Sequence, residues 1–147
     1  MSRVDVASAK DLTAIRALLE RSGLPTSDLE SARPEFAVIR EEGQVIAAGA
    51  LQRFGSSALL RSVVVAPDRR GSGLGQVMVT ELERIACAAR ISSLVLLTQS
   101  AAEFFARQGY RAIERSAAPQ DMQGSEEFRS LCPSSATCMA KSLSDSP

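Results

Sequence analysis

The chain has 147 residues, of which 45% are hydrophobic and 23% are charged, and its formal net charge is zero at pH 7. This length suffices for one domain with a hydrophobic core and is too short for two ordinary ones, so a single domain over residues 1–147 is expected. A neutral chain without runs of like charge does not attract nucleic acid as a whole, and its apolar runs are too short to span a bilayer. Neither a nucleic-acid partner nor a membrane partner is expected.

The numbers of Cys and His residues exclude further classes of site and bear on the compartment. Three cysteines, an odd number, favour a reducing compartment over a disulfide framework. The first ten residues lack the apolar block of a signal peptide, so a cytoplasmic location is expected. The sequence contains no His, which removes His-based catalytic triads and HExxH zinc sites, and no metal site is expected.

The N-terminal half predicts one strand, one helix, a short helical turn that opens at Ser27 or Asp28, and then three consecutive strands. A short strand is expected at residues 3–7. The helix is expected at residues 9–21, where apolar residues recur at helical spacing, and Gly23 ends it. Tight turns then join three strands into an antiparallel meander. These strands are expected at residues 36–40, 45–53 and 59–66.

The C-terminal half predicts an alternation of helices and strands. Ser100 is the expected N-cap of the second of these helices, with Glu103 in the capping-box position. The apolar strand between the two helices is expected to be buried on both faces. The expected elements are a helix at 77–90, a strand at 93–98, a helix at 100–108, a strand at 111–115, a helical turn at 126–131 and a strand at 137–143.

A glycine-rich bend, P-D-R-R-G-S-G-L-G-Q, connects the strand at 59–66 to the helix at 77–90. Its three glycines, at positions 71, 73 and 75, let the backbone approach a phosphate closely. The first amides of a helix have no intrahelical partner, and the helix dipole adds favourable charge for an anion. With Arg70 beside it, this bend predicts a diphosphate-binding site.

Two other glycine-rich phosphate loops fit this bend less well. A P-loop needs Gly-Lys-Ser/Thr, which the sequence lacks. A Rossmann loop follows the first strand of a βαβ repeat, whereas these glycines follow the fourth strand of a mostly antiparallel run.

The bend and a later block carry a resemblance to a known family. Residues 70–75, R-G-S-G-L-G, match the signature Q/R-x-x-G-x-G/A, and residues 101–110 match A-x-x-F-F-x-x-x-G-Y. On these motifs and the order of its elements, the chain resembles the GNAT superfamily of acyl-CoA-dependent N-acyltransferases over nearly its whole length. The resemblance implies an α/β (α+β) fold with a central mixed, mostly antiparallel, splayed sheet of about six to seven strands, flanked by about four helices.

The resemblance also implies acetyl-CoA as the co-substrate, lying in a split between the strands at 59–66 and 93–98. Pantetheine would hydrogen-bond to the backbone near Val63 and Val65, and Phe105 would approach it. For Phe105, packing in the core is the alternative interpretation. The residues implied for the diphosphate and its surroundings are Arg70, Gly71, Ser72, Gly73, Leu74, Gly75 and Gln76.

The implied reaction is attack of a neutral amine on the thioester carbonyl, with a backbone N–H near Val63 as the oxyanion donor. Many family members carry a Tyr four residues before the Gly that ends this helix, but here Phe105 occupies that position. Tyr110 follows that Gly and is expected to be structural. Some relatives carry a Glu early in the strand before the bend, where this chain has Arg61 and Ser62. The sequence therefore assigns no catalytic acid or base, and a water-mediated base is a hypothesis.

Arg61 is costly to bury in the run L-L-R-S-V-V-V-A unless an anion or a carboxylate pairs with it. Strand parity would place it on one face with Val63 and Val65. On one interpretation its planar guanidinium clamps an acidic group of the substrate, with Ser62 and Arg53 as further substrate-binding candidates. On the other interpretation, it is a surface Arg on a half-exposed sheet.

The C-terminal string E-F-R-S-L-C-P-S-S-A-T-C-M-A-K resembles a GNAT subfamily linked to arsenic-resistance gene clusters. A related branch acetylates the amine of arsinothricin and phosphinothricin, so the resemblance implies a small, acidic, amino-acid-like amine as substrate and leaves a homodimer open. Two alternatives are a non-catalytic acyl-CoA-binding sensor on the same fold and an arsenite-responsive thiol protein that uses Cys132 and Cys138. For both cysteines packing is the plainer interpretation, and Cys87 is expected to pack as well.

Overall fold

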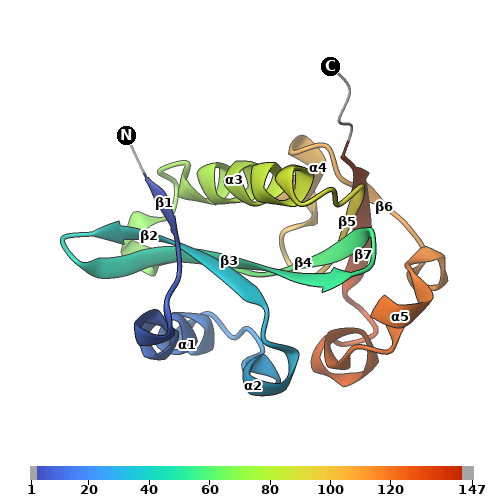
Figure 1. Cartoon of the computed structure of the whole chain (residues 1–147), viewed down its shortest axis with the longest axis horizontal. Coiled ribbons are helices and arrows are strands. Elements are labelled where there is room, and N and C mark those ends of the chain that lie inside the picture. The colour runs from blue at the N-terminus through green and yellow to red at the C-terminus, as the bar shows by residue number, and fades with distance from the viewer. Residues whose placement is uncertain (1–2, 144–147) are drawn as a thin grey trace.

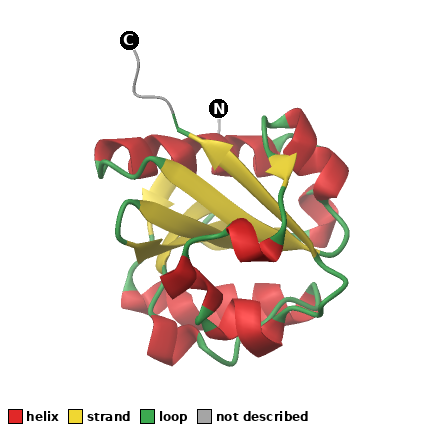
Figure 2. Cartoon of the chain, turned by 90° about the vertical axis from the view of Figure 1, so that its right-hand side faces the viewer, coloured by secondary structure: helices red, strands yellow, loops and turns green. Residues whose placement is uncertain are grey.

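The computed structural model describes residues 3–143, which form a seven-stranded sheet in the order β1-β2-β3-β4-β5-β7-β6. Helices lie on both faces of this sheet, with α3 and α4 on one side and α1 and α2 on the other (Figures 1 and 2). Within the described residues, every pairing is antiparallel except that between β4 and β5. The predicted mixed, mostly antiparallel fold class is confirmed.

The elements follow the expected order along the chain. The strands are Val4–Val6 (β1), Glu35–Glu41 (β2), Gln44–Phe54 (β3), Ser57–Val65 (β4), Ser93–Thr98 (β5), Arg111–Ala112 (β6) and Thr137–Ser142 (β7). The α-helices are Leu12–Arg21 (α1), Leu29–Ala32 (α2), Leu74–Ala88 (α3), Ala102–Arg107 (α4) and Gln120–Gln123 (α5). Short 3₁₀ turns cover Ala9–Asp11 (η1), Pro67–Arg69 (η2) and Arg115–Ala117 (η3), and a π-helical turn covers Glu127–Leu131 (η4).

Two local expectations were wrong. The β6 strand ends at Ala112 instead of Arg115, because Arg115 begins the turn η3. The N-cap of α4 is Ala101 instead of Ser100, and the backbone N–H of Ala101 donates to Thr98 Oγ1 at 3.0 Å. This bond fixes the start of α4 from the end of β5, and no side chain among the described residues caps the helix.

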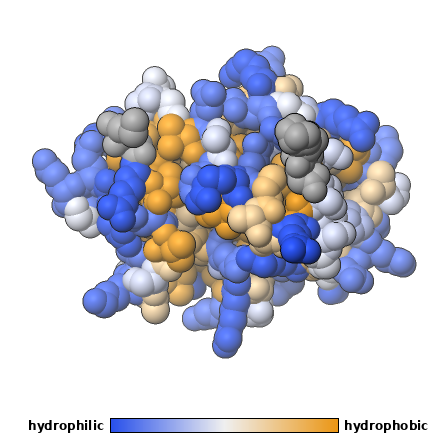
Figure 3. Space-filling model, turned by 45° about the horizontal axis from the view of Figure 1, so that its top comes forward, coloured by the Kyte–Doolittle hydropathy of each residue, from blue (hydrophilic) through white to orange (hydrophobic). Residues whose placement is uncertain are grey.

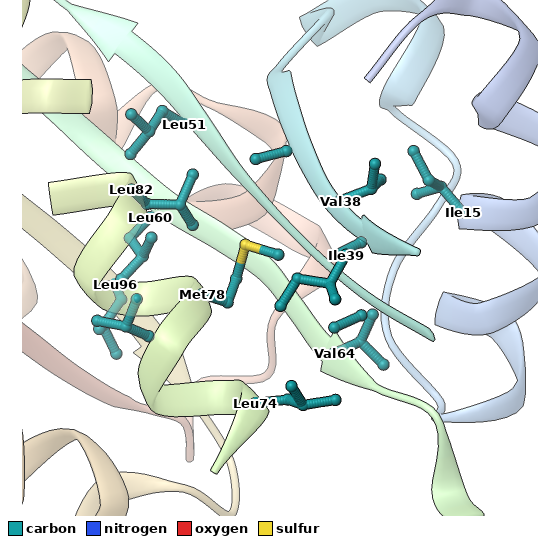
Figure 4. Close-up of a cluster of buried hydrophobic side chains, with 14 of the residues drawn as sticks. Ile15, Val38, Ile39, Leu51, Leu60, Val64, Leu74, Met78, Leu82 and Leu96 are labelled. Carbon is teal, nitrogen blue, oxygen red and sulfur yellow. The ribbon is translucent and has the colours of Figure 1, made fainter. Parts of the chain in front are cut away.

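The α3 helix packs against the centre of the sheet. Its fully buried Met78 and Leu82 lie beside Leu51 and Leu60 of the central strands (Figure 4). This close approach depends on Gly49 of β3, because a Cβ at that position would lie 2.7 Å from Leu82 Cδ1 and 2.9 Å from Met78 Cγ. The missing side chain of Gly49 thus sets how closely α3 packs on β3.

Replacing Gly49 with Ala should therefore overpack this contact and lower the free energy of unfolding by about 1–3 kcal/mol. Gly124→Ala is the matched control, because Gly124 has an ordinary φ of −82° and its nearest neighbour would lie 3.4 Å from the new Cβ. Urea denaturation of both variants measures the difference. Equal stabilities for the two variants would show that α3 shifts freely over β3.

A β-bulge interrupts β4 at the residues that precede the glycine-rich bend. In the pairing of β3 with β4, Arg61 lies opposite Ala50 and Val64 lies opposite Ala48, so Ser62 and Val63 together oppose only Gly49. Ser62 adopts a φ of 60°, which is the left-handed region. Opposed residues share a face of the sheet. Arg61 therefore shares its face with Val64, and the expectation that it would share a face with Val63 and Val65 was wrong.

The sheet is splayed where β4 and β5 separate. Their parallel pairing covers only Ser57–Ser93, Ala58–Leu94 and Leu59–Val95, although β4 continues to Val65 and β5 to Thr98. Because β5 remains paired with β7 along its full length, the gap opens on one side only. The predicted split between these two strands is present.

Hydrophilic residues cover much of the face shown in Figure 3, with apolar side chains gathered in patches between them. Among the described residues, no helix is both long enough and apolar enough to traverse a bilayer.

Candidate functional site

A cleft of about 900 Å³ occupies the gap between β4 and β5. It is the larger of two cavities described for the molecule, the other measuring about 500 Å³. Its walls come from the second half of β4, the glycine-rich bend, the end of β5, α4 and the loop after α1. Among the residues predicted for the cofactor, those that line it are Val63, Val65, Arg70, Gly71, Gly73, Leu74, Gly75, Gln76 and Phe105.

The glycine-rich bend presents unpaired backbone amides to this cleft. Gly71 and Gly73 adopt φ values of 82° and 85°, and Gly73 is the N-cap of α3. Among the described residues, no acceptor pairs with the amides of positions 71–76. The first amide with a partner is that of Val77, which donates to the Gly73 carbonyl at 3.1 Å. A row of free N–H groups at the start of a fifteen-residue helix is an anion-binding arrangement.

Side chains hold the bend in place on both sides. The Ser72 hydroxyl donates to the Arg69 carbonyl, and the Arg69 guanidinium pairs with Glu41 of the β2–β3 hairpin. Arg70 Nε donates to the Val65 carbonyl at 3.2 Å, and its Nη2 donates to Ser22 Oγ at 3.0 Å. Arg70 thus bonds only to neutral oxygens here, so its positive charge adds to the attraction for an anion. Ser72 itself is not part of the cleft wall.

The aromatic residues of α4 and the loop after it form a packed row. The Phe105 ring meets Phe104 and Tyr110 edge to face, with ring centroids 5.0 and 5.6 Å apart. Phe105 is 7% exposed and also lines the cleft, so it both packs and contacts the space predicted for the cofactor. The Tyr110 hydroxyl donates to Glu83 Oε2 at 2.9 Å, and burial raises its pKa, in keeping with a structural role.

The guanidinium of Arg61 is fully enclosed by partners. Its Nη1 and Nη2 donate to both carboxylate oxygens of Asp28 at 2.7 Å. Nη1 also reaches Gln52 Oε1 at 3.1 Å, Nε reaches Ser62 Oγ at 3.3 Å, and Nη2 lies 3.2 Å from Glu127 Oε1. Four of the five guanidinium N–H groups therefore donate hydrogen bonds to the protein, and the Glu127 contact is an ion pair.

This network corrects one of the two interpretations of Arg61. Its side chain is 0% exposed, so it is not a surface Arg. Arg61 lines the cleft, with most of its donors bonded to protein groups, and the clamp on an acidic substrate stays a prediction. The expected cost of burying Arg61 is offset by Asp28 and Glu127, which come from chain segments far from β4.

Ser62 and Arg53, the other predicted substrate residues, lie on different cavities. Ser62 lines the cleft at the bulge. Arg53 lies on the other cavity, where its Nε pairs with Glu35 Oε1 at 2.8 Å on the surface. Arg53 lies opposite Ala58, where β4 is paired with β5, and it does not line the cleft, so its substrate role stays a prediction that the cleft geometry does not support.

Glu127 is a cleft residue that the sequence did not reveal. It begins the turn η4, is 4% exposed and lines the same cleft as Ser62 and Val63. Burial raises the pKa of its carboxyl, partly offset by the charge of Arg61. The string that begins at Glu127 carried a subfamily resemblance but no signal for this pairing, because Glu127 and Arg61 are 66 positions apart in the chain.

The three cysteines differ in their exposure. Cys138 is buried in β7, Cys132 is partly buried at the cleft, and desolvation raises the pKa of the Cys132 thiol to about 11. Within residues 3–143, no group of three or more His, Cys, Asp or Glu side chains is arranged to hold a metal ion. Cys87 is exposed on α3, so the expectation that it packs in the core was wrong.

Comparison with known proteins places this geometry in context. A model of the acetyltransferase (GNAT) domain matches residues 32–112, which is more than half of the chain. An amino-acid acetyltransferase of Aliivibrio fischeri (strain MJ11) is 29% identical over 103 residues. That alignment covers 69% of this chain and 23% of the relative, so the chain spans less than a quarter of the relative's length.

Two solved structures share the whole fold. Rv2747 from Mycobacterium tuberculosis, in complex with CoA and NLQ, has a TM-score of 0.83 and 26% identity, covering 97% of this chain and 99% of that one. N-acetylglutamate synthase from Neisseria gonorrhoeae, complexed with coenzyme A and N-acetyl-glutamate, has a TM-score of 0.84. It is 20% identical and covers 98% of this chain but 35% of that chain, so this second likeness shows the fold alone.

Proposed function

This chain belongs to the acetyltransferase (GNAT) domain family, and from that premise we propose that it transfers the acetyl group of acetyl-CoA to the amine of a small, acidic, amino-acid-like substrate. The observation that carries the proposal is the row of unpaired amides at positions 71–76 beside the split between β4 and β5. A diphosphate fits such amides, and an extended pantetheine fits the unpaired edges of two splayed strands. The thiols of the described residues are free, which suits the reducing cytoplasm.

The relatives support the substrate class. The Aliivibrio fischeri relative is an amino-acid acetyltransferase, and the Neisseria gonorrhoeae structure contains N-acetyl-glutamate. The C-terminal string at 127–141 resembles the arsenic-resistance subfamily, so arsinothricin and phosphinothricin are the more specific candidates within this class. Arg61 lines the cleft and is the predicted clamp for the substrate's acidic group, although Asp28 already accepts two of its hydrogen bonds.

The chain's own residues explain how the reaction would proceed. The bulge leaves β4 with one more residue than β3 between Arg61 and Val64, so a backbone amide there lacks a ladder partner. That amide, from Ser62 or Val63, is the proposed donor to the oxyanion that forms on the thioester carbonyl. Phe105 offers no hydroxyl to the departing thiolate, so the thiolate leaves unassisted or takes its proton through water.

Release of free thiol from acetyl-CoA tests the proposal. Purified protein, incubated with acetyl-CoA and a panel of amines, should release thiol fastest with acidic amino acids such as glutamate, phosphinothricin or arsinothricin, and slowest with their decarboxylated analogues. Acetyl-CoA binding without turnover on any amine would instead favour the sensor. Arsenite binding that Cys132→Ser abolishes, with no thiol release, would favour the thiol protein.

A further inference from the structure

The proton acceptor for the substrate's ammonium has few candidates in this cleft. The sequence contains no His. Among the described residues, Glu127 is the only Asp or Glu that lines the cleft. The other titratable acid on its wall is the thiol of Cys132, and a pKa of about 11 keeps that thiol protonated near neutral pH. The remaining ionisable groups on the wall are arginines, which do not accept protons.

The geometry points to Glu127 as the residue that removes the proton from the substrate amine, an inference that rests on the proposed function. The substrate's amine cannot attack the thioester while it is protonated, because its nitrogen then has no free lone pair. A carboxylate inside the cleft meets that requirement directly. It also supplies the negative charge that an incoming ammonium would pair with before it loses its proton.

The partners of Arg61 show why Glu127, and not Asp28, has this capacity. Asp28 accepts two hydrogen bonds at 2.7 Å from the guanidinium, so both of its oxygens are committed. Glu127 pairs with Arg61 less tightly, with Oε1 at 3.2 Å from Nη2. Burial raises the pKa of the Glu127 carboxyl, and a more basic carboxylate is a stronger proton acceptor.

The fold holds Glu127 in place from several directions. The Cys132 amide donates to the Glu127 carbonyl at 3.1 Å, which closes the π-helical turn η4. Arg115 Nη1 donates to the Phe128 carbonyl at 3.3 Å and ties η4 to the loop after β6. In Figure 1 the orange segment that follows α5 lies on the α1 and α2 side of the sheet, opposite α3. The turn η4, which carries Glu127, is therefore on the face opposite α3, whose N-terminus carries the glycine-rich bend.

One ammonium proton moves to the Glu127 carboxylate, and the neutral amine then forms a C–N bond to the thioester carbonyl carbon. When the tetrahedral intermediate collapses, the C–S bond breaks and coenzyme A leaves as the thiolate, which takes the second nitrogen proton through water. Glu127 returns its proton to solvent, so the products are the acetamide, free coenzyme A thiol and one proton.

Glu127→Gln tests this role, with Glu126→Gln as the matched control on the exposed neighbouring carboxylate. At pH 7, Glu127→Gln should lower kcat/KM for the amine about 100-fold, while the KM for acetyl-CoA stays within about twofold. The variant needs amine that is already neutral, so its kcat/KM should rise about tenfold per pH unit until the pKa of the substrate amine. The kcat/KM of the parent protein should stay constant over the same pH range. Glu126→Gln should have the same kcat/KM and the same pH dependence as the parent protein.

Three outcomes would overturn the inference. Full kcat/KM in Glu127→Gln would remove the residue from the reaction. A loss that is equal at every pH would give Glu127 a structural role only. If Glu127→Gln does not fold, Glu127→Asp replaces it and should keep the flat pH profile at about tenfold lower kcat/KM; a profile that rises with pH would contradict the proposal. Failure of the parent itself to acetylate any amine would instead overturn the proposed function.

Discussion

Gly73→Glu should weaken acetyl-CoA binding about 100-fold while the protein remains folded. Gly73 is the N-cap of α3 and lines the cleft, and no atom lies within 4 Å of where its Cβ would be. The new carboxylate would therefore stand among the free amides at positions 71–76 and repel the diphosphate. Like charges placed together cost several kcal/mol, and a 100-fold loss of affinity corresponds to about 2.7 kcal/mol.

Gly43→Glu provides the control for both the charge and the backbone strain. Gly43 lies in the turn between β2 and β3, has a φ of 81° against 85° for Gly73, and also has no atom within 4 Å of the Cβ position. Both variants should lose about 1–3 kcal/mol of stability from the left-handed conformation. Only Gly73→Glu should lose affinity for acetyl-CoA in calorimetric titration. Equal affinities would mean that the bend does not hold the diphosphate.

Arg61→Met should lower the free energy of unfolding by about 3–5 kcal/mol, because it leaves Asp28 and Glu127 buried without their cation. For a chain of this length the melting temperature should fall by roughly 10 °C. The loss of activity should be larger for acidic than for neutral amines when both are measured well below the new melting temperature. Thermal and urea denaturation, followed by kinetics on both amine classes, measure these effects.

Arg53→Met is the matched control, because Arg53 forms an ion pair with Glu35 on the surface. An exposed pair of this kind contributes less than about 1 kcal/mol, so this variant should be nearly as stable as the parent. The double variant Arg61→Met/Asp28→Leu should recover part of the stability lost by Arg61→Met, since apolar side chains then replace a buried ion pair. An equal loss of activity for acidic and neutral amines in Arg61→Met would mean that Arg61 has a structural role only.

Local patterns predicted most of the fold. The alternation of apolar and polar residues, the tight turns and the helical spacing each depend on neighbours in the chain, and the predicted strands and helices appear in the expected order. The glycine-rich bend was predictable for the same reason, because the conformations of Gly71 and Gly73 and the free amides of a helix start are local properties.

The features that the sequence did not predict depend on pairing between residues that are distant in the chain. The bulge that places Arg61 on the face of Val64 arises from the register of β4 against β3, and side-chain parity in one strand carries no information about that register.

The sequence by itself determined the order of the elements, the glycine-rich bend and the absence of His. Only the tertiary structure decided that Asp28 and Glu127 meet Arg61, and that one of these two carboxylates lines the cleft. The physical reason is that conformational preferences act between near neighbours, whereas an ion pair needs two charges a few ångströms apart, which only the packed sheet and its flanking turns bring together.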